Sequence, residues 1–304
     1  FRWGSKFLEH DREKKMISYQ RNGFVKTTEL SLPYWDDISG TIRGYRIFTA
    51  CRTVNDKIFR LEDHLDRLYK SAEAIYMRPP MDREELEAVL QDLVSKNIAL
   101  CEGCELLLDI IFSGGLEGSS MKQSGKGAHL YVAVQEMVPP APEAYRDGVA
   151  LATFSHQRIF PGVKLLNYIG AIIAHQTVVP IIQGYDTLFI CPEDKDTILE
   201  GSTFTIFFVT SSGEIITPPL DGRILESVTR KVIFELLTPD PNFSLKEGQV
   251  RLSNLDTLSE CFLASTTRNI LPVTRLDNRT IGSGKPGPVT KRAMQALKDY
   301  VNSY

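Results

Sequence analysis

The chain has few cysteines, no long uninterrupted apolar run and almost no net charge. Five cysteines among 304 residues are sparse and odd in number, which favours free thiols and a reducing, cytoplasmic compartment. The longest apolar run, residues 169–182, is interrupted by His175 and Gln176 and is shorter than the roughly 20 residues of a membrane span. A net charge of −3 does not point to nucleic acid or membrane as a partner.

Metal and nucleotide motifs are also lacking. Cys101 and Cys104 have the spacing of half a zinc site or a redox pair, but no second pair accompanies them, so two ordinary thiols are expected. Residues 282–287 match G-x-G-x-x-G without the strand that should precede it, which favours a turn before the last helix. The five histidines have no metal-ligand spacing, and His64 is interpreted as structural.

The length favours two domains, and a cluster of prolines predicts where one domain ends and the next begins. Residues 1–16 are charged, lack the apolar stretch of a secretory signal and are expected to be an extension. Residues 17–136 are predicted to form a small α/β domain and residues 149–304 a large one. Residues 137–148 contain clustered prolines that favour an extended interdomain linker. An α+β fold with a cleft between two domains is therefore expected.

Periodicity gives a coarse series of elements. Asn22-Gly23 between short apolar runs predicts an opening hairpin over residues 18–25. Leu61, Leu65 and Leu68 begin the apolar face of an amphipathic helix. Further strands are predicted at residues 44–52, 105–112, 128–135, 149–154, 187–191, 205–210 and 213–217, and further helices at 83–97, 169–182, 228–237 and 289–301.

Lys164 stands between a glycine-containing turn and the apolar run that begins at Ile169. Burial lowers the pKa of an amine and makes it a nucleophile toward carbonyl groups, which is what covalent attachment of an aldehyde requires. A surface lysine in a misinterpreted loop is the alternative from this segment alone.

An ordered series of motifs follows Lys164. It comprises residues 184–190 (GYDTLFI), 199–209 (LEGSTFTIFFV), 216–220 (ITPPL) and 224–230 (ILESVTR). In order and spacing the series resembles the class IV aminotransferases of fold type IV, the group of branched-chain and D-amino acid aminotransferases and aminodeoxychorismate lyase. The resemblance extends from about Ile17 to the C-terminus. It implies a cofactor cleft between two domains, pyridoxal 5'-phosphate, amino acid and 2-oxo acid substrates, and a homodimer.

The resemblance also assigns roles to residues. Lys164 corresponds to the lysine that binds the cofactor covalently and then moves a proton as acid and base. Glu200 corresponds to the acid that pairs with the pyridine nitrogen, and Tyr168 to the tyrosine that bonds the ring oxygen. The phosphate is assigned to Arg67, with Arg60 as competitor, to the backbones of Val228 and Thr229 at a helix start, and to Thr266.

Departures from the family pattern bear on the substrate. Thr205 and Ser227 stand where the family usually has Asn and Gly, and Thr49 stands where branched-chain enzymes carry an acid. Arg43, Arg46 and Phe48 are the predicted substrate-binding residues. Arg43 resembles the arginine with which an unusual subgroup of D-amino acid transaminases binds the α-carboxylate, and is expected to reach the neighbouring subunit.

Two reaction classes stay open at this stage. Transamination of a D-amino acid or a branched-chain amino acid is favoured. Aminodeoxychorismate lyase, which eliminates pyruvate, is the alternative because residues 48–52 (FTACR) also resemble its F-T-T-A-R segment. Asp109 stands where the D-amino acid subgroup has a second arginine, which counts against a full match to that subgroup.

Overall fold

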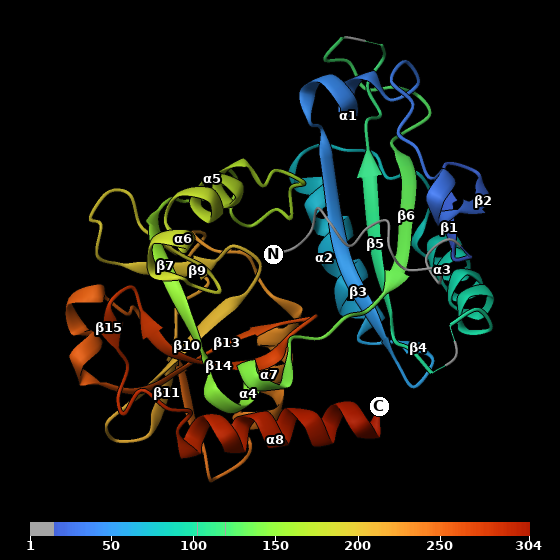
Figure 1. The fold of residues 1–304 in the computed structure, drawn as a ribbon. Coiled ribbons are helices and arrows are strands. Elements are labelled where there is room, and N and C mark those ends of the chain that lie inside the picture. The colour runs from blue at the N-terminus through green and yellow to red at the C-terminus, as the bar shows by residue number, and fades with distance from the viewer. Residues whose placement is uncertain (1–14, 102, 119) are drawn as a thin grey trace. The chain divides into compact units, whose positions relative to one another are not determined.

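The computed structural model describes residues 15–101, 103–118 and 120–304, so nearly all of the predicted extension, residues 1–16, lies outside the described part. The chain forms two compact units (Figure 1). The first contains the described residues up to Val138 together with Val163–Asn167 and Tyr304, and the second contains Pro139–Gly162 and Tyr168–Ser303. The grouping of Val163–Asn167 with the first unit was not expected from the sequence.

A six-stranded antiparallel sheet forms the first unit, in the order β2-β1-β6-β5-β3-β4. The predicted hairpin is confirmed, with Arg21 and Asn22 at the turn between the first two strands. The strands are β1 (Ile17–Gln20), β2 (Gly23–Lys26), β3 (Arg46–Val54), β4 (Lys57–Ile58), β5 (Leu106–Ser113) and β6 (His129–Glu136).

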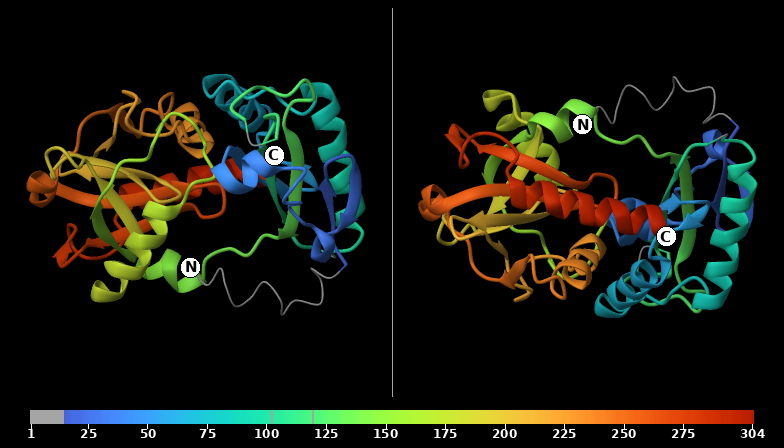
Figure 2. Two further views of the ribbon diagram at one scale, coloured as in Figure 1. Left: turned by 90° about the horizontal axis from the view of Figure 1, so that it is seen from above. Right: turned by 90° about the horizontal axis from the view of Figure 1, so that it is seen from below.

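Two helices cover one face of this sheet (Figures 1 and 2). They are α2 (Leu61–Ala74), which begins at the first of the predicted leucines, and α3 (Arg83–Ile98), which is close to its predicted range. Their apolar stripes share a core with alternate residues of β5 and β6, as expected for amphipathic helices on a sheet. A further helix, α1 (Ile38–Arg43), was not predicted because one and a half turns carry too little periodicity. The Asp37 side chain caps it by accepting from Gly40 N at 3.3 Å.

A nine-stranded mixed sheet forms the second unit, in the order β12-β11-β10-β13-β14-β7-β8-β9, with β15 beside β14. Three neighbouring pairs are parallel, β11 with β12, β14 with β7, and β7 with β8. The strands are β7 (Val149–Ser155), β8 (Asp186–Ile190), β9 (Ile198–Gly201), β10 (Thr205–Thr210), β11 (Glu214–Thr217), β12 (Ser244–Glu247), β13 (Leu258–Ser265), β14 (Asn269–Leu276) and β15 (Arg279–Thr280).

The helices of the second unit correct two sequence predictions. Residues 142–147 of the predicted extended linker form α4 (Pro142–Asp147), because proline is compatible with the first turn of a helix. The predicted helix over 169–182 is divided into α5 (Ile169–Thr177) and α6 (Val179–Ile182), because Pro180 cannot continue a helix's hydrogen bonding. The helices α7 (Val228–Leu237) and α8 (Pro288–Ser303) pack on β13 and its neighbours, and α8 follows the turn predicted at residues 282–287 (Figure 2).

The cysteines correct a third prediction. Cys101 and Cys104 form a disulfide after α3, with their Cα atoms 5.6 Å apart, a separation that a disulfide can bridge. Free thiols are found at Cys51, Cys191 and Cys261, all of them buried. Across the part of the chain that the structure describes, no helix is both long and apolar enough to span a membrane.

Candidate active site

Lys164 lies on a short segment that extends the sheet of the first unit. Phe48 N donates to Lys164 O at 3.0 Å, Leu166 N donates to Arg46 O at 3.1 Å, and Ile47 and Leu165 form an antiparallel bridge. Residues opposite each other in such a ladder point to the same face. Lys164 therefore shares a face with Phe48, and its Nζ lies 4.7 Å from the centroid of the Phe48 ring.

Strand registers define the rest of this surface, which we call the lysine face. One row across β3, β5 and β6 consists of Phe48, Ile111 and Tyr131. The next row on the same face consists of Ala50, Asp109 and Ala133. These side chains point away from the core that α2 and α3 cover, because the alternate residues of the same strands form that core. The lysine face thus combines an amine, two aromatic rings and a carboxylate.

Asp109 is the acid of the lysine face. Gln135 Nε2 donates to its Oδ2 at 3.4 Å. Burial raises the pKa of Asp109 to about 6, against the opposing effects of the Lys164 charge and the Gln135 hydrogen bond. The sequence analysis singled out Asp109 only as a departure from the D-amino acid subgroup and predicted no function for it.

Arg67, the predicted phosphate ligand, is oriented by two neighbours. Its Nη2 donates to Thr49 Oγ1 at 2.9 Å, and Thr49 Oγ1 lies 2.9 Å from Nδ1 of His64. The Thr49 hydroxyl therefore joins the Arg67 guanidinium to the His64 ring. Thr49 therefore supports Arg67 at the position where branched-chain enzymes carry an acid.

The pKa of His64 reflects the positive charge of this region. Burial lowers its pKa well below the usual value, and the charges of Arg67, Lys164 and Arg60 lower it further. The imidazole is therefore neutral near pH 7, so the positive charge of this region comes from Arg67, Lys164 and Arg60. The structural role predicted for His64 agrees with its burial and its hydrogen bond to Thr49.

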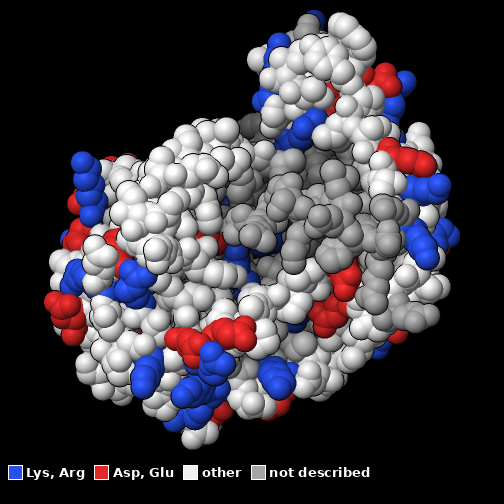
Figure 3. All heavy atoms as spheres, in the orientation of Figure 1, with Lys and Arg blue, Asp and Glu red and all other residues white. Residues whose placement is uncertain are grey.

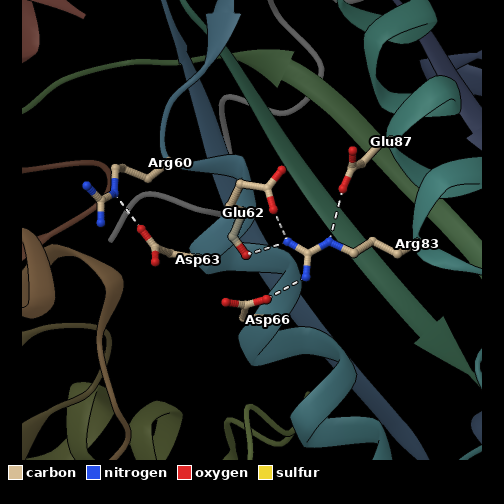
Figure 4. A network of polar contacts seen from close by, with 6 residues as sticks. All are labelled: Arg60, Glu62, Asp63, Asp66, Arg83 and Glu87. Carbon is tan, nitrogen blue, oxygen red and sulfur yellow. Dashed lines mark hydrogen bonds and ion pairs between the residues drawn. The ribbon is translucent and has the colours of Figure 1, made fainter.

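Arg60, the competitor for the phosphate, is paired with an acid of its own helix start (Figure 4). Arg60 Nε is paired with Asp63, three residues later at the start of α2. The Arg60 backbone N–H donates to the Tyr304 hydroxyl at 3.1 Å. This pairing neutralises much of the Arg60 charge, which favours Arg67 as the phosphate ligand.

Arg83 fixes α2 from the neighbouring helix (Figure 4). It pairs with Glu62 and, at 2.5 Å, with Asp66 on α2, and with Glu87 on α3 at 3.0 Å. The contacts with Glu62 and Asp66 connect the first turns of α2 to the first turn of α3, and Glu87 holds the Arg83 side chain from within α3. They hold the part of α2 that carries His64 and Arg67.

The two predicted substrate arginines lie in different settings. Arg46 donates to Ser113 Oγ at 2.7 Å and contacts the buried Asp37 carboxylate at 3.3 Å. Arg43 ends α1, is exposed, and donates to Ser120 O at 3.3 Å. Arg46 is thus bound within its own unit, whereas Arg43 presents its guanidinium at the surface.

In the second unit, Glu200 is held by a buried ion pair. Arg158 Nη2 and Nε donate to Glu200 Oε1 at 2.6 and 3.0 Å, and Leu225 N lies 3.3 Å from both carboxylate oxygens. Burial alone lowers the pKa of Arg158, but the Glu200 charge and hydrogen bond outweigh it and raise that pKa. Tyr168, just before α5, contributes to the same raised pKa.

Arg158 is a residue that sequence reasoning missed. It follows β7 and belongs to no motif, so no local signal could have identified it. Its role depends on its proximity to Glu200, which is 42 residues away along the chain. The ion pair fixes the carboxylate's orientation and favours its charged form.

The start of α7 and the β13–β14 turn have the chemistry of an anion site. Ser227 caps α7 by accepting from Arg230 N at 3.3 Å, and the N–H groups of Val228 and Thr229 lie outside the helix's own bonding pattern. The buried Ser265 hydroxyl, beside Thr266, has no hydrogen-bond partner among the described residues. Ser227 in place of the family's usual Gly is therefore compatible with an anion-binding helix start.

Comparison with known proteins identifies the family. The profile of the family "Amino-transferase class IV" matches residues 46–276. The chain belongs to the class IV aminotransferases. It is a pyridoxal phosphate-dependent enzyme, as the members of this family are, and the predicted fold class is confirmed.

Relatives of this class IV aminotransferase have two kinds of name. A Methanocaldococcus jannaschii protein provisionally named a branched-chain-amino-acid aminotransferase is 29% identical over 290 residues, 93% of this chain and 96% of that protein. The D-alanine aminotransferase of Bacillus licheniformis is 28% identical over 269 residues, 86% and 90% of the two chains. The Escherichia coli branched-chain amino acid aminotransferase structure has the same fold, with a TM-score of 0.82 at 21% identity over 95% and 96% of the chains.

Proposed function

We propose that this enzyme transfers the amino group of a D-amino acid or a branched-chain amino acid to a 2-oxo acid. The observation that carries the proposal is the position of Lys164, held by backbone hydrogen bonds beside Phe48 on a face that also carries polar groups. When bound, pyridoxal phosphate supplies an aldehyde and an electron-withdrawing ring. Lys164 would hold that aldehyde covalently, and its amine would be the acid and base for proton transfer at the substrate α-carbon.

The other predicted residues divide the remaining tasks. Glu200, fixed by Arg158, pairs with the pyridine nitrogen, and Tyr168 bonds the ring oxygen. Arg67, the N–H groups of Val228 and Thr229, and Thr266 hold the phosphate. The unpartnered Ser265 hydroxyl and the cations around neutral His64 support these assignments, because both are features of an anion site.

Substrate contacts are assigned to Arg43, Arg46 and Phe48. The Phe48 ring packs beside the Lys164 amine, where it can contact a substrate side chain. Arg43 is the better candidate for a carboxylate ligand, since Arg46 already pairs with Asp37. Because Arg43 is exposed at the end of α1, we propose that it reaches the site of a second subunit.

A homodimer is supported by the surface of α5 and α6. Ile169, Ile172, Ile173 and Ile181 are 64%, 54%, 48% and 79% exposed, and Figure 3 shows few charged side chains over this region. Exposed apolar patches of this kind indicate a protein interface. A second copy of the chain bound to this surface also accounts for the exposed position of Arg43.

The function is tested by mixing the enzyme with each amino acid of a panel of D- and L-enantiomers. The absorbance of the bound cofactor monitors each half-reaction. Pyruvate or 2-oxoglutarate is then supplied to complete the cycle. Turnover that depends on an acceptor 2-oxo acid supports transamination. Pyruvate release from aminodeoxychorismate without an acceptor would instead support the lyase alternative, which the names of the relatives do not favour.

A further inference from the structure

Asp109 occupies an unusual position on the lysine face. Among the described residues that β3, β5 and β6 direct to this face, it is the only acid. Its direct neighbours across the strands are Ala50 and Ala133, whose methyl groups cannot cover a carboxylate. The acid therefore lies between two small side chains, two residues along β3 and β5 from Phe48 and Ile111.

Asp109 has little value as a structural residue. Its Oδ2 accepts a long hydrogen bond of 3.4 Å from Gln135, and burial makes its charged form unfavourable. Hydrophobic or small residues could fill this position at lower cost to the fold. A carboxylate that destabilises the fold at neutral pH and lies within electrostatic reach of Lys164 has the properties of a functional group.

We propose that Asp109 is a specificity-determining residue. It favours substrates whose side chain ends in a cationic or hydrogen-bond-donating group and disfavours substrates that carry a second carboxylate there. This inference rests on the proposed function, because it concerns the substrate of the transamination at Lys164.

The physical basis is charge interaction in a site that is partly shielded from water. Two unit charges about 7 Å apart at an effective dielectric constant of about 20 change an equilibrium by roughly tenfold to a hundredfold. The charge at the end of the ligand decides whether Asp109 strengthens or weakens its binding. Asp109 attracts an ammonium group and repels a carboxylate, and it leaves a methyl terminus unaffected.

A matched set of ligands measures this effect on binding without turnover. Hexanoate, adipate and 6-aminohexanoate have six-carbon chains that end in a methyl, a carboxylate and an ammonium group. Calorimetric titration of the holoenzyme is expected to give adipate the weakest binding. In Asp109→Asn, adipate should bind about tenfold tighter and 6-aminohexanoate about tenfold weaker, while hexanoate changes less than about twofold.

Asp92→Asn is the control for net charge. Asp92 lies on α3, the helix layer opposite the lysine face, and pairs with Lys96. All three ligands should bind this variant as they bind the wild type. Equal changes in the two variants would overturn the inference.

Kinetics with norleucine, lysine and 2-aminoadipate, each as both enantiomers, give the second measurement. Asp109→Asn should raise kcat/KM for 2-aminoadipate relative to lysine by roughly a hundredfold. An equal loss for all three substrates would show that Asp109 only positions Lys164, and would overturn the specificity role. If the wild type transaminated none of them, nor any other amino acid, the proposed function would fail, while the binding titration would still decide the charge preference.

Discussion

Glu200 is the residue whose surroundings bear most directly on chemistry. Its carboxylate faces the Arg158 guanidinium at 2.6 Å and the Leu225 amide at 3.3 Å. Both contacts favour a charged acid in a fixed orientation. A charged partner at the pyridine nitrogen stabilises the positive ring that draws electrons from the substrate.

Glu200→Gln is therefore expected to retain the cofactor and to lose rate. One lost charged hydrogen bond of about 3 kcal/mol corresponds to a decrease in kcat of roughly a hundredfold. Single-turnover kinetics and absorbance of the bound cofactor measure the two properties separately. Unchanged turnover would remove Glu200 from its assigned role.

Arg43 and Arg46 should respond differently to substitution. Arg46→Ala leaves the buried Asp37 without its ion pair and should lower the free energy of unfolding by about 2 to 4 kcal/mol. Arg43→Ala should change that energy by less than about 0.5 kcal/mol, but should raise KM for amino acids roughly tenfold to a hundredfold. Denaturant titration with steady-state kinetics tests both variants, and Arg43→Lys should restore KM only in part.

Asp109 should make the stability of the protein depend on pH. Its pKa is about 6 in the folded protein, above the ordinary value of 3.8, so the destabilisation by its charge is absent below about pH 4 and complete above about pH 6. Asp109→Asn should raise the free energy of unfolding by about 1 to 3 kcal/mol at pH 8 and leave it unchanged near pH 4. Chemical denaturation at the two pH values checks this, and a constant difference would contradict the shifted pKa.

At the scale of elements, the segment carrying Lys164 depends on two backbone hydrogen bonds. Leu166→Pro removes the N–H that donates to Arg46 O. A proline is compatible with an extended residue before it, such as Leu165 in its bridge to Ile47, so the lost hydrogen bond is the main effect. We expect a loss of about 1 to 3 kcal/mol in stability and weaker retention of the cofactor. Leu166→Ala keeps the N–H and is the control. Equal cofactor dissociation rates in both variants would show that this bond does not position Lys164.

Sequence periodicity recovered the long elements and missed those whose pattern is short or uniform. The amphipathic α2 was predicted because leucines recur at helical spacing. The strands β13 and β14 were missed because both faces of each are buried for most of their length, which removes the alternation that marks a strand. The place of Lys164 beside β3 could not be predicted, since the pairing joins residues more than a hundred positions apart.

The sequence motifs identified most of the candidate site residues but not the contacts that orient them. Lys164, Arg67 and Glu200 were assigned by resemblance, and their roles remain proposals. The contacts that orient Arg67 and Glu200 come from Thr49, His64 and Arg158. Supporting contacts of this kind depend on the fold, and different residue types can provide them, so they leave no fixed spacing in the sequence.

For the whole molecule, the apolar surface of α5 and α6 predicts self-association. We expect a mass near twice 34.2 kDa by light scattering. A double substitution, Ile172→Asp with Ile173→Asp, should shift the protein toward monomer and lower activity, because Arg43 would lose its place in the second subunit. Leu220→Asp, at a residue that is 39% exposed and lies outside this surface, is the control. A wild type that stays monomeric at micromolar concentration would contradict the dimer.

The late position of Lys164 in the chain has a consequence for biosynthesis. Residues up to Val138 leave the ribosome first, but the first unit also needs Val163–Asn167. Until those residues emerge, the backbone of Arg46 and Phe48 has an open strand edge on the nascent chain. Such edges invite pairing with other chains. A chaperone that binds extended segments would therefore be most useful during this interval of translation, which ends when the lysine itself closes the edge.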